Sequence, residues 1–180
     1  MKILRAADRV AVPWKNGGGV TREVAVWPPG AGLDTFDWRV SIAEVSSAGP
    51  FSHFAGVDRA LAILKGRMAL DFADRAVVLD AQSPPFAFAG DVSCYGTSIG
   101  GAVTDLNVMT RRGRCTARME RIAGETFSTT AATMVVVTAE TTVHFGKEKL
   151  SLNSCDAVFD ENGGTFSLLE GHIAFAVFFQ

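Results

Sequence analysis

Residues 36–45 read FDWRVSIAEV, a stretch in which apolar and polar side chains alternate. Successive side chains of a β-strand point to opposite faces, so this period of two predicts a half-buried strand with two chemically different faces. Arg39 and Ser41 share one of these faces. The opposite face is expected to carry Trp38, Val40 and Ile42.

Similar strand patterns follow along the rest of the chain. Residues 104–113 (TDLNVMTRRG) alternate in the same way, and residues 59–72 (RALAILKGRMALDF) are apolar on both sides of a Lys-Gly-Arg turn, which predicts a hairpin. No segment predicts a long amphipathic helix, and only residues 5–10 are suited to a short one. Many short strands at regular spacing predict an all-β protein, a sandwich or barrel. One series of strands near 36–110 and another near 115–180 predict two small barrels that share a packed interface.

Composition excludes several classes of protein. The 180 residues include 17 Lys and Arg against 19 Asp and Glu, a net charge of −2, so the basic surplus of a nucleic-acid binder is absent. Three cysteines without a CxxC pair predict neither a disulfide framework nor a zinc ribbon. The start, MKILRAADRVAVPW, lacks the apolar run of a signal peptide, and no window is apolar enough to span a membrane. We therefore expect a cytoplasmic protein that binds neither nucleic acid nor membrane.

The first motif with chemical content is PWKNGGGVTREV, residues 13–24. Three consecutive glycines are favoured where the backbone approaches something closely or takes a positive φ. The motif is neither a Walker loop nor a dinucleotide fingerprint. It is either a flexible surface turn or a binding loop, whose ligand contacts would come from Trp14, Lys15, Asn16, Thr21, Arg22 and Glu23.

The second motif, residues 41–66, resembles the first metal-binding motif of cupins, small β-barrel proteins in which a His-x-His pair and a Glu hold a metal ion. Ser52 and Phe54 stand near the histidine positions, and Arg59 stands at the glutamate position. Phe cannot ligate a metal, and a guanidinium repels one. We therefore expect no metal and no cofactor, and we expect His53 to be an ordinary turn residue.

Arg59 begins a strand that is otherwise apolar, and two interpretations of it stay open. If it is buried, its charge needs a partner. That partner is an acidic side chain of the protein, Asp58 or Asp105, or it is the carboxylate of a ligand held by the two-pronged guanidinium. Asn107 lies mid-strand between apolar neighbours and would also need partners. Asn107 and Met109 would form either a structural network or the wall of a pocket.

Taken together, PWKNGGGVTRE, the segment from FDWRVSIAEV to Gly66, FAFAGD and DLNVMTRRG closely resemble the HutD/Ves family of bacterial proteins over about residues 10–114. The resemblance implies a metal-free bicupin, a single unit over residues 1–180, with one cupin-like barrel at about 1–114 and a second at 115–180. It further implies a role in moderating histidine utilisation, with formylglutamate or urocanate as candidate ligands, or a stress-related role as in the Ves branch.

The leading functional hypothesis is a non-enzymatic binding protein for a small anionic metabolite. Its predicted ligand-binding residues are Trp14, Lys15, Asn16, Arg22, Arg39, Ser41, Arg59, Asn107 and Met109. The alternative is a metal-free enzyme, an isomerase or hydrolase, with Glu44 or Asp58 as general base, although no catalytic arrangement is legible. A weaker option is a protein–protein adaptor. Exposed sheet edges often pair, so a homodimer is also an expectation.

Overall fold

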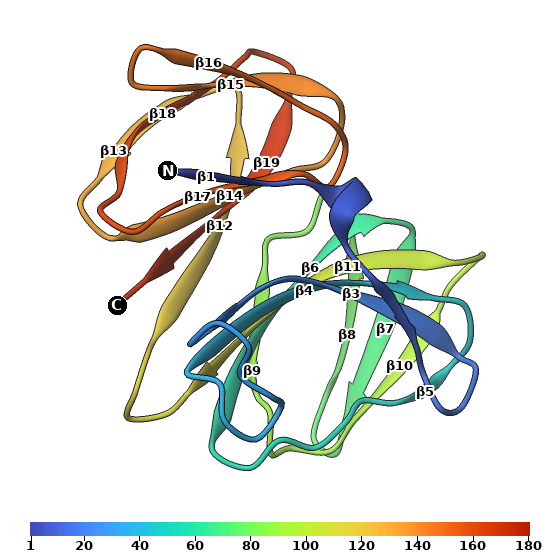
Figure 1. Cartoon of the computed structure of the whole chain (residues 1–180). Helices are drawn as coiled ribbons and strands as arrows, with labels where there is room; N and C mark the ends of the chain where they lie inside the picture. Colours follow the sequence, from blue (N-terminus) through green and yellow to red (C-terminus); the bar gives the residue numbers. More distant parts are fainter. The chain divides into compact units, whose positions relative to one another are not determined.

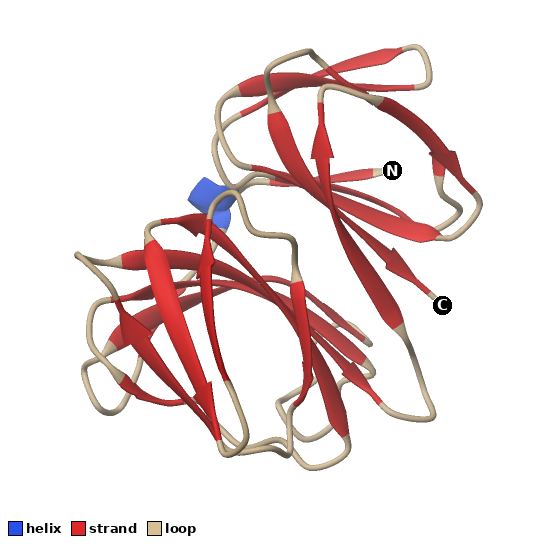
Figure 2. Ribbon diagram, turned by 180° about the vertical axis from the view of Figure 1, so that it is seen from behind, coloured by secondary structure: helices blue, strands red, loops and turns tan.

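The computed structural model describes residues 1–180 and is all-β, as the sequence predicts. Its strands are joined by turns and loops (Figure 2). The short helix expected over residues 5–10 is a single 3-10 turn, Ala6–Asp8. No helix in the structure combines the length and the apolar character needed to cross a membrane.

The chain divides into two compact units, which we name by their position in the sequence. The N-terminal unit is Val10–Thr116, and the C-terminal unit is Ala117–Gln180 together with Met1–Arg9. Residues 1–9, which were expected in the first barrel, belong instead to the C-terminal unit. The reason is strand pairing, because β1 (Lys2–Leu4) pairs antiparallel with β17 (Ala157–Asp160).

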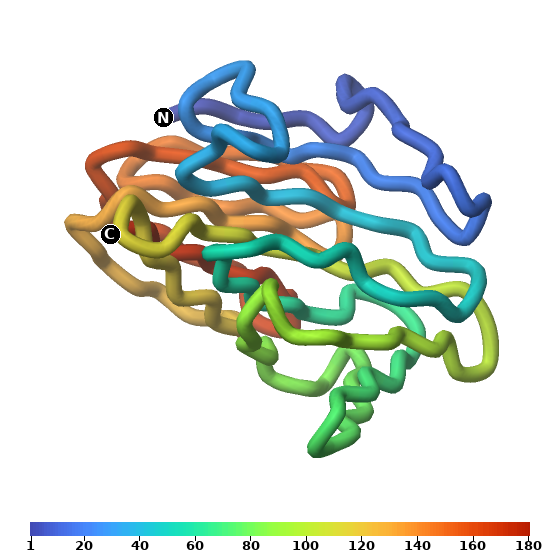
Figure 3. Tube along the Cα trace, turned by 90° about the horizontal axis from the view of Figure 1, so that it is seen from below, coloured from blue at the N-terminus to red at the C-terminus, as the bar shows by residue number.

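The N-terminal unit contains two antiparallel sheets. A six-stranded sheet has the order β2-β3-β4-β11-β6-β9, and a four-stranded sheet has the order β5-β10-β7-β8 (Figure 1). The Cα trace in Figure 3 shows β3 and β4, in two shades of blue, side by side. The strands are β2 (Ala11–Pro13), β3 (Gly19–Trp27), β4 (Trp38–Val45), β5 (Gly49–Pro50), β6 (Val57–Lys65), β7 (Arg67–Phe72), β8 (Ala76–Asp80), β9 (Phe86–Ala89), β10 (Cys94–Ser98) and β11 (Val103–Arg111).

The hairpin expected at residues 59–72 is wrong, although both of its strands exist. β6 belongs to the six-stranded sheet, whereas β7 pairs with β8 and β10 in the other sheet. Gly66, at φ +87°, turns the chain from one sheet into the other. Leu61 of β6 and Met68 of β7 then lie in one shared core. The two strands therefore face each other across the interior of the unit.

The C-terminal unit is also built from two antiparallel sheets, ordered β1-β17-β14-β19-β12 and β13-β18-β15-β16. Its core is almost wholly apolar and draws on both sheets, with Val135 and Val143 on opposite sides and Phe166 among the largest buried side chains. Its remaining strands are β12 (Ala117–Ala123), β13 (Thr126–Thr129), β14 (Ala132–Val137), β15 (Thr141–Phe145), β16 (Glu148–Leu152), β18 (Gly164–Leu168) and β19 (Ile173–Phe179).

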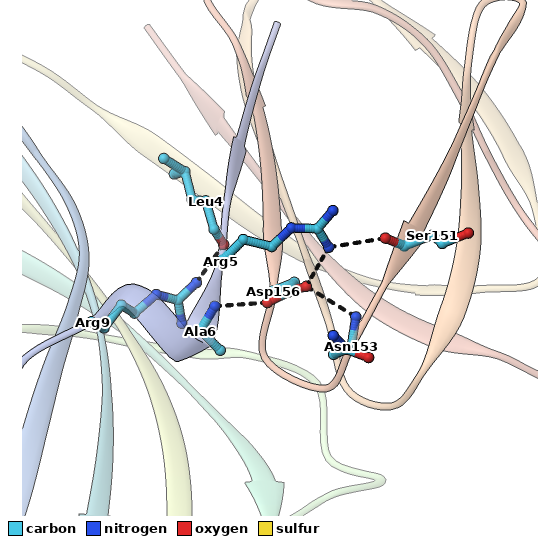
Figure 4. A network of polar contacts seen from close by, with 7 residues as sticks. All are labelled: Leu4, Arg5, Ala6, Arg9, Ser151, Asn153 and Asp156. Atoms are coloured by element: carbon cyan, nitrogen blue, oxygen red, sulfur yellow. Dashed lines mark hydrogen bonds and ion pairs between the residues drawn. The ribbon is translucent and has the colours of Figure 1, made fainter.

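A polar network around Asp156 holds residues 1–9 against this unit (Figure 4). The buried carboxylate of Asp156 accepts hydrogen bonds from the Ala6 backbone N–H at 2.7 Å and the Asn153 backbone N–H at 3.0 Å. The Arg5 guanidinium adds an ion pair at 2.7 Å. Burial opposes ionisation, but these donors outweigh it and lower the pKa of Asp156. The N-terminal segment is therefore fixed by both a strand pairing and a buried charge.

Candidate functional site

One face of the six-stranded sheet points into the N-terminal unit and carries an unusual number of polar groups. The antiparallel register aligns Arg39, Met109 and Arg59 in one row, and Ser41, Asn107 and Leu61 in the next. Asp105 follows in a third row beside Ala43 and Ile63. The polar side chains on this inward face are Glu23, Arg39, Ser41, Arg59, Asp105 and Asn107.

The other wall of the interior is apolar. It is formed by Met68 and Leu70 of β7 and Cys94 of β10, all of which belong to the core of this unit. Burial raises the pKa of the Cys94 thiol, which favours its neutral form. Gly96 leaves room for Phe51, because a Cβ at this glycine would lie 2.6 Å from the Phe51 ring. The interior thus has a polar side and an apolar side, as is common in small-molecule sites.

Arg59 is the central group of this candidate site. Its side chain is buried, with 7% of the residue exposed, so it does not face solvent. Its Nε donates to Asn107 Oδ1 at 3.3 Å and its NH1 to the Ser52 carbonyl at 3.5 Å, both long for charge-assisted bonds. Burial lowers the pKa of Arg59 to about 10. The cation is therefore desolvated, charged and poorly satisfied by the protein.

Aromatic rings surround the Arg59 guanidinium. Its Cζ lies 4.9 Å from the Phe51 ring centroid, 5.1 Å from that of Phe88 and 5.9 Å from that of Phe54. Ring faces attract a cation and exclude water. These contacts hold the planar guanidinium in place without using its hydrogen-bond donors.

Asp105 is the second charged group of this interior, and it is 2% exposed. No protein group donates a hydrogen bond to its carboxylate, and no ion pair joins it to Arg59. Burial raises the pKa of Asp105 to about 7, and the Arg59 charge opposes this rise. Of the two candidate partners predicted for Arg59, Asp58 is wrong, because it is exposed and binds Arg112 at 2.7 Å. Asp105 acts on Arg59 only through its electrostatic field.

Arg39 and Ser41 share the inward face, as the period of two predicts. The Arg39 Nε donates to Glu23 Oε2 at 2.8 Å, and its NH1 donates to the Ser41 hydroxyl at 3.3 Å. Arg39 therefore already has a carboxylate partner within the protein, whereas Arg59 has none.

The glycine-rich motif forms the turn before β3 and the start of that strand. The Trp14 indole Nε1 donates to Thr21 Oγ1 at 2.7 Å, and the Trp14 ring packs on the core. Asn16 Oδ1 accepts from the Gly18 N–H at 3.0 Å and so shapes the turn. A Cβ at Gly19 would lie 2.6 Å from the Glu44 carbonyl oxygen, so this glycine permits a close approach of two backbones.

Several predicted site residues lie outside the interior. Arg22 is aligned with Ile42 on the opposite face of the sheet and pairs with Glu44. Lys15 is exposed in the turn. Glu44 and Asp58, the general bases of the enzyme alternative, are exposed and each pairs with an arginine. Successive side chains of a strand point to opposite faces, and Glu44 and Asp58 each adjoin an inward-facing residue, so both point outward.

The cupin metal positions hold no ligand set. Ser52 and His53 are exposed. No group of three or more His, Cys, Asp or Glu side chains is placed to hold a metal ion.

The structure also adds residues to the candidate site. Asp105 and the rings of Phe51 and Phe88 were not among the predicted ligand-binding residues, and Glu23, expected as a ligand contact of the glycine-rich motif, instead binds Arg39. For Asp105 the signal was present, because it shares the alternating face with Asn107 and Met109. For the rings no local signal exists, since they reach Arg59 only through the fold.

Comparisons with known proteins place this geometry in a wider class. A cupin 2 conserved barrel domain protein from Leptotrichia buccalis superposes with a TM-score of 0.59 at 8% identity, covering 93% of this chain and 91% of that one. The fold is therefore that of a cupin-like all-β protein. A sequence model of HutD matches residues 6–175, and the chain belongs to the HutD family.

Its relatives agree with this assignment. HutD from Pseudomonas fluorescens SBW25 superposes with a TM-score of 0.85 at 34% identity, covering 99% of this chain and 97% of that one. An uncharacterized 21.2 kDa protein in the hutC 3′ region of Pseudomonas putida is 36% identical over 77% of this chain and 73% of its own. Protein Ves of Citrobacter koseri is 41% identical over 64% of this chain, and the match spans only 60% of the Ves protein.

Proposed function

We propose that this protein binds a small carboxylate metabolite inside the N-terminal unit and that Arg59 holds the carboxylate. The observation that carries this proposal is a buried guanidinium whose only hydrogen bonds are 3.3 and 3.5 Å long and which has no carboxylate partner. A buried charge without a partner is costly, and a bidentate carboxylate is the best partner for a guanidinium.

The neighbouring side chains have distinct roles in this proposal. Asn107 orients the guanidinium through its hydrogen bond to Nε, and Ser41 lies in the same row of the sheet. Phe51, Phe88 and Met68 supply the apolar contact. Lys15 and Arg22 take no part, because the first is exposed and the second lies on the other face of the sheet.

We further propose that binding serves to moderate histidine utilisation in the cytosol, with formylglutamate or urocanate as the ligand. Support comes from membership of the HutD family and from the relative in the hutC 3′ region of Pseudomonas putida. Both ligands carry a carboxylate. The proposal also includes a bicupin architecture, which is supported by the two facing sheets of each unit.

Isothermal titration of the whole chain with urocanate and N-formylglutamate, with product analysis of the same mixtures, tests the function. We expect saturable binding of at least one ligand and no turnover. Absence of binding to both, or turnover of either, would contradict the proposed binding protein.

A further inference from the structure

The inward face of the six-stranded sheet holds a buried guanidinium and a buried carboxyl group that form no ion pair with each other. Arg59 is 7% exposed and Asp105 is 2% exposed, yet the two side chains form no ion pair. Asp105 acts on Arg59 through its electrostatic field without forming an ion pair, and its carboxylate oxygens receive no hydrogen bond. An unsatisfied buried carboxylate costs free energy, so such a group is expected to have a partner when the site is occupied.

The register sets the spacing of these two charges. Asp105 and Asn107 lie two residues apart on one face of β11, which separates their side chains by roughly 7 Å. The Arg59 Nε reaches Asn107, so the guanidinium lies about one row away from the Asp105 carboxylate. A ligand whose carboxylate binds Arg59 therefore needs only a few further bonds to place a donor group beside Asp105.

Resting on the proposed function, we infer that the ligand is a short bifunctional molecule, whose carboxylate pairs with Arg59 and whose N–H or O–H group donates to Asp105. A plain carboxylate would satisfy the cation and leave Asp105 without a partner. A ligand with both groups satisfies both charges at once. Asp105 is then a specificity-determining residue that selects carboxylates bearing a donor.

A pair of nearly isosteric probes tests this selection directly. N-acetylglycine carries an amide N–H one carbon from its carboxylate, and levulinate has a CH₂ in place of that N–H. Dissociation constants for both are measured by NMR titration of the whole chain. A charge-assisted hydrogen bond predicts that N-acetylglycine binds about one to two orders of magnitude more tightly than levulinate. 4-Hydroxypentanoate carries a hydroxyl in place of the levulinate ketone. Comparing its dissociation constant with that of levulinate shows whether an O–H group can also donate to Asp105.

The variant Asp105→Leu removes every acceptor at this position. We expect it to bring the ratio of the two dissociation constants close to one while levulinate still binds. Removing an unpartnered buried carboxylate is compatible with folding, which a thermal melt verifies. Asp105→Asn keeps a neutral acceptor, and its ratio should lie between those of the wild type and Asp105→Leu.

The outcomes separate this inference from the proposed function. Equal binding of all three probes by the wild type, or a preference that survives Asp105→Leu, overturns the inference and leaves carboxylate binding intact. Failure of all three probes to bind overturns both. Tighter binding of either donor-bearing probe, lost in Asp105→Leu, supports the inference.

Discussion

The Arg59 Nε donates a 3.3 Å hydrogen bond to Asn107 Oδ1 across the pairing of β6 with β11. This bond holds the guanidinium beside the inward face of the sheet, while its second bond goes to the Ser52 carbonyl. It also leaves most of the five N–H donors of the arginine free for a ligand.

Arg59→Lys keeps the positive charge but loses the planar fork, so affinity for the carboxylate should fall by about one to two orders of magnitude. Isothermal titration with the ligand identified from urocanate and N-formylglutamate measures this fall. The matched control is Arg22→Lys, since Arg22 lies on the opposite face of the same sheet. Equal affinities for wild type and Arg59→Lys, with folding intact, would remove Arg59 from the site.

Asp105 should make stability fall as pH rises. Its pKa is raised from 3.8 to about 7 in the folded protein, so the folded state binds a proton more tightly than the unfolded state. Its contribution is fully present below about pH 4 and is lost as pH rises through 7. The difference of about three units corresponds to roughly 4 kcal/mol. Asp105→Asn should therefore melt higher than the wild type at pH 8, and this gain should shrink toward pH 4. An increase in melting temperature that is the same at every pH would contradict the raised pKa of Asp105.

Gly19→Ala should destabilise the N-terminal unit, because the new Cβ would lie 2.6 Å from the Glu44 carbonyl oxygen and 3.1 Å from the Trp14 ring. Relieving this contact requires a backbone shift, and overpacking of this kind lowers the free energy of unfolding by roughly 1–3 kcal/mol. Gly17→Ala is the control, since nothing lies within 4 Å of its Cβ and only the φ of +70° opposes the change. Thermal melts of the two variants compare the two effects, and an equal loss in both would argue against the close approach at Gly19.

Asp156→Ala should release residues 2–4 from the C-terminal unit. The change removes the acceptor for the Ala6 and Asn153 N–H groups and the partner of Arg5, at a cost of roughly 2–4 kcal/mol. Because the folded pKa of Asp156 is lowered, this stabilisation is present above about pH 4 and is lost as pH falls through the folded value. Hydrogen exchange of the residue 2–4 amides measures the release, and Asp8→Ala, an exposed acid in the same segment, is the control. Unchanged protection in Asp156→Ala would show that β1 pairing alone holds the segment.

The sequence predicted strands more reliably than it predicted their partners. Alternation over residues 36–45 and 104–113 is a local property, and both segments are strands of the six-stranded sheet. The pairing of β1 with β17 joins residues more than 150 positions apart, which no local pattern can indicate. Apolar runs on both sides of Gly66 suit a hairpin and a change of sheet equally well, so the hairpin prediction failed there.

The candidate site was predictable in part for a similar reason. Arg39, Ser41, Asn107 and Met109 lie on the inward face of the sheet, as the alternation in their strands predicts. Arg59 was predicted from its place in the cupin-like motif rather than from alternation, and it lies on the same face. Arg22 was predicted as part of the glycine-rich motif, whose sequence does not indicate which residues share a face. It lies on the outward face of the sheet. Asp105 was considered only as a partner for Arg59, since acidic side chains are seldom fully buried without one.

The placement of residues 1–9 in the C-terminal unit has a consequence for synthesis on the ribosome. β1 is translated before Val10–Thr116, but its partner β17 is made only after the whole of that unit has been translated. The N-terminal unit contains every strand of its own two sheets, so its sheets can form while residues 1–9 are still unpaired. A segment translated before the N-terminal unit therefore has no pairing partner until β17 has been made.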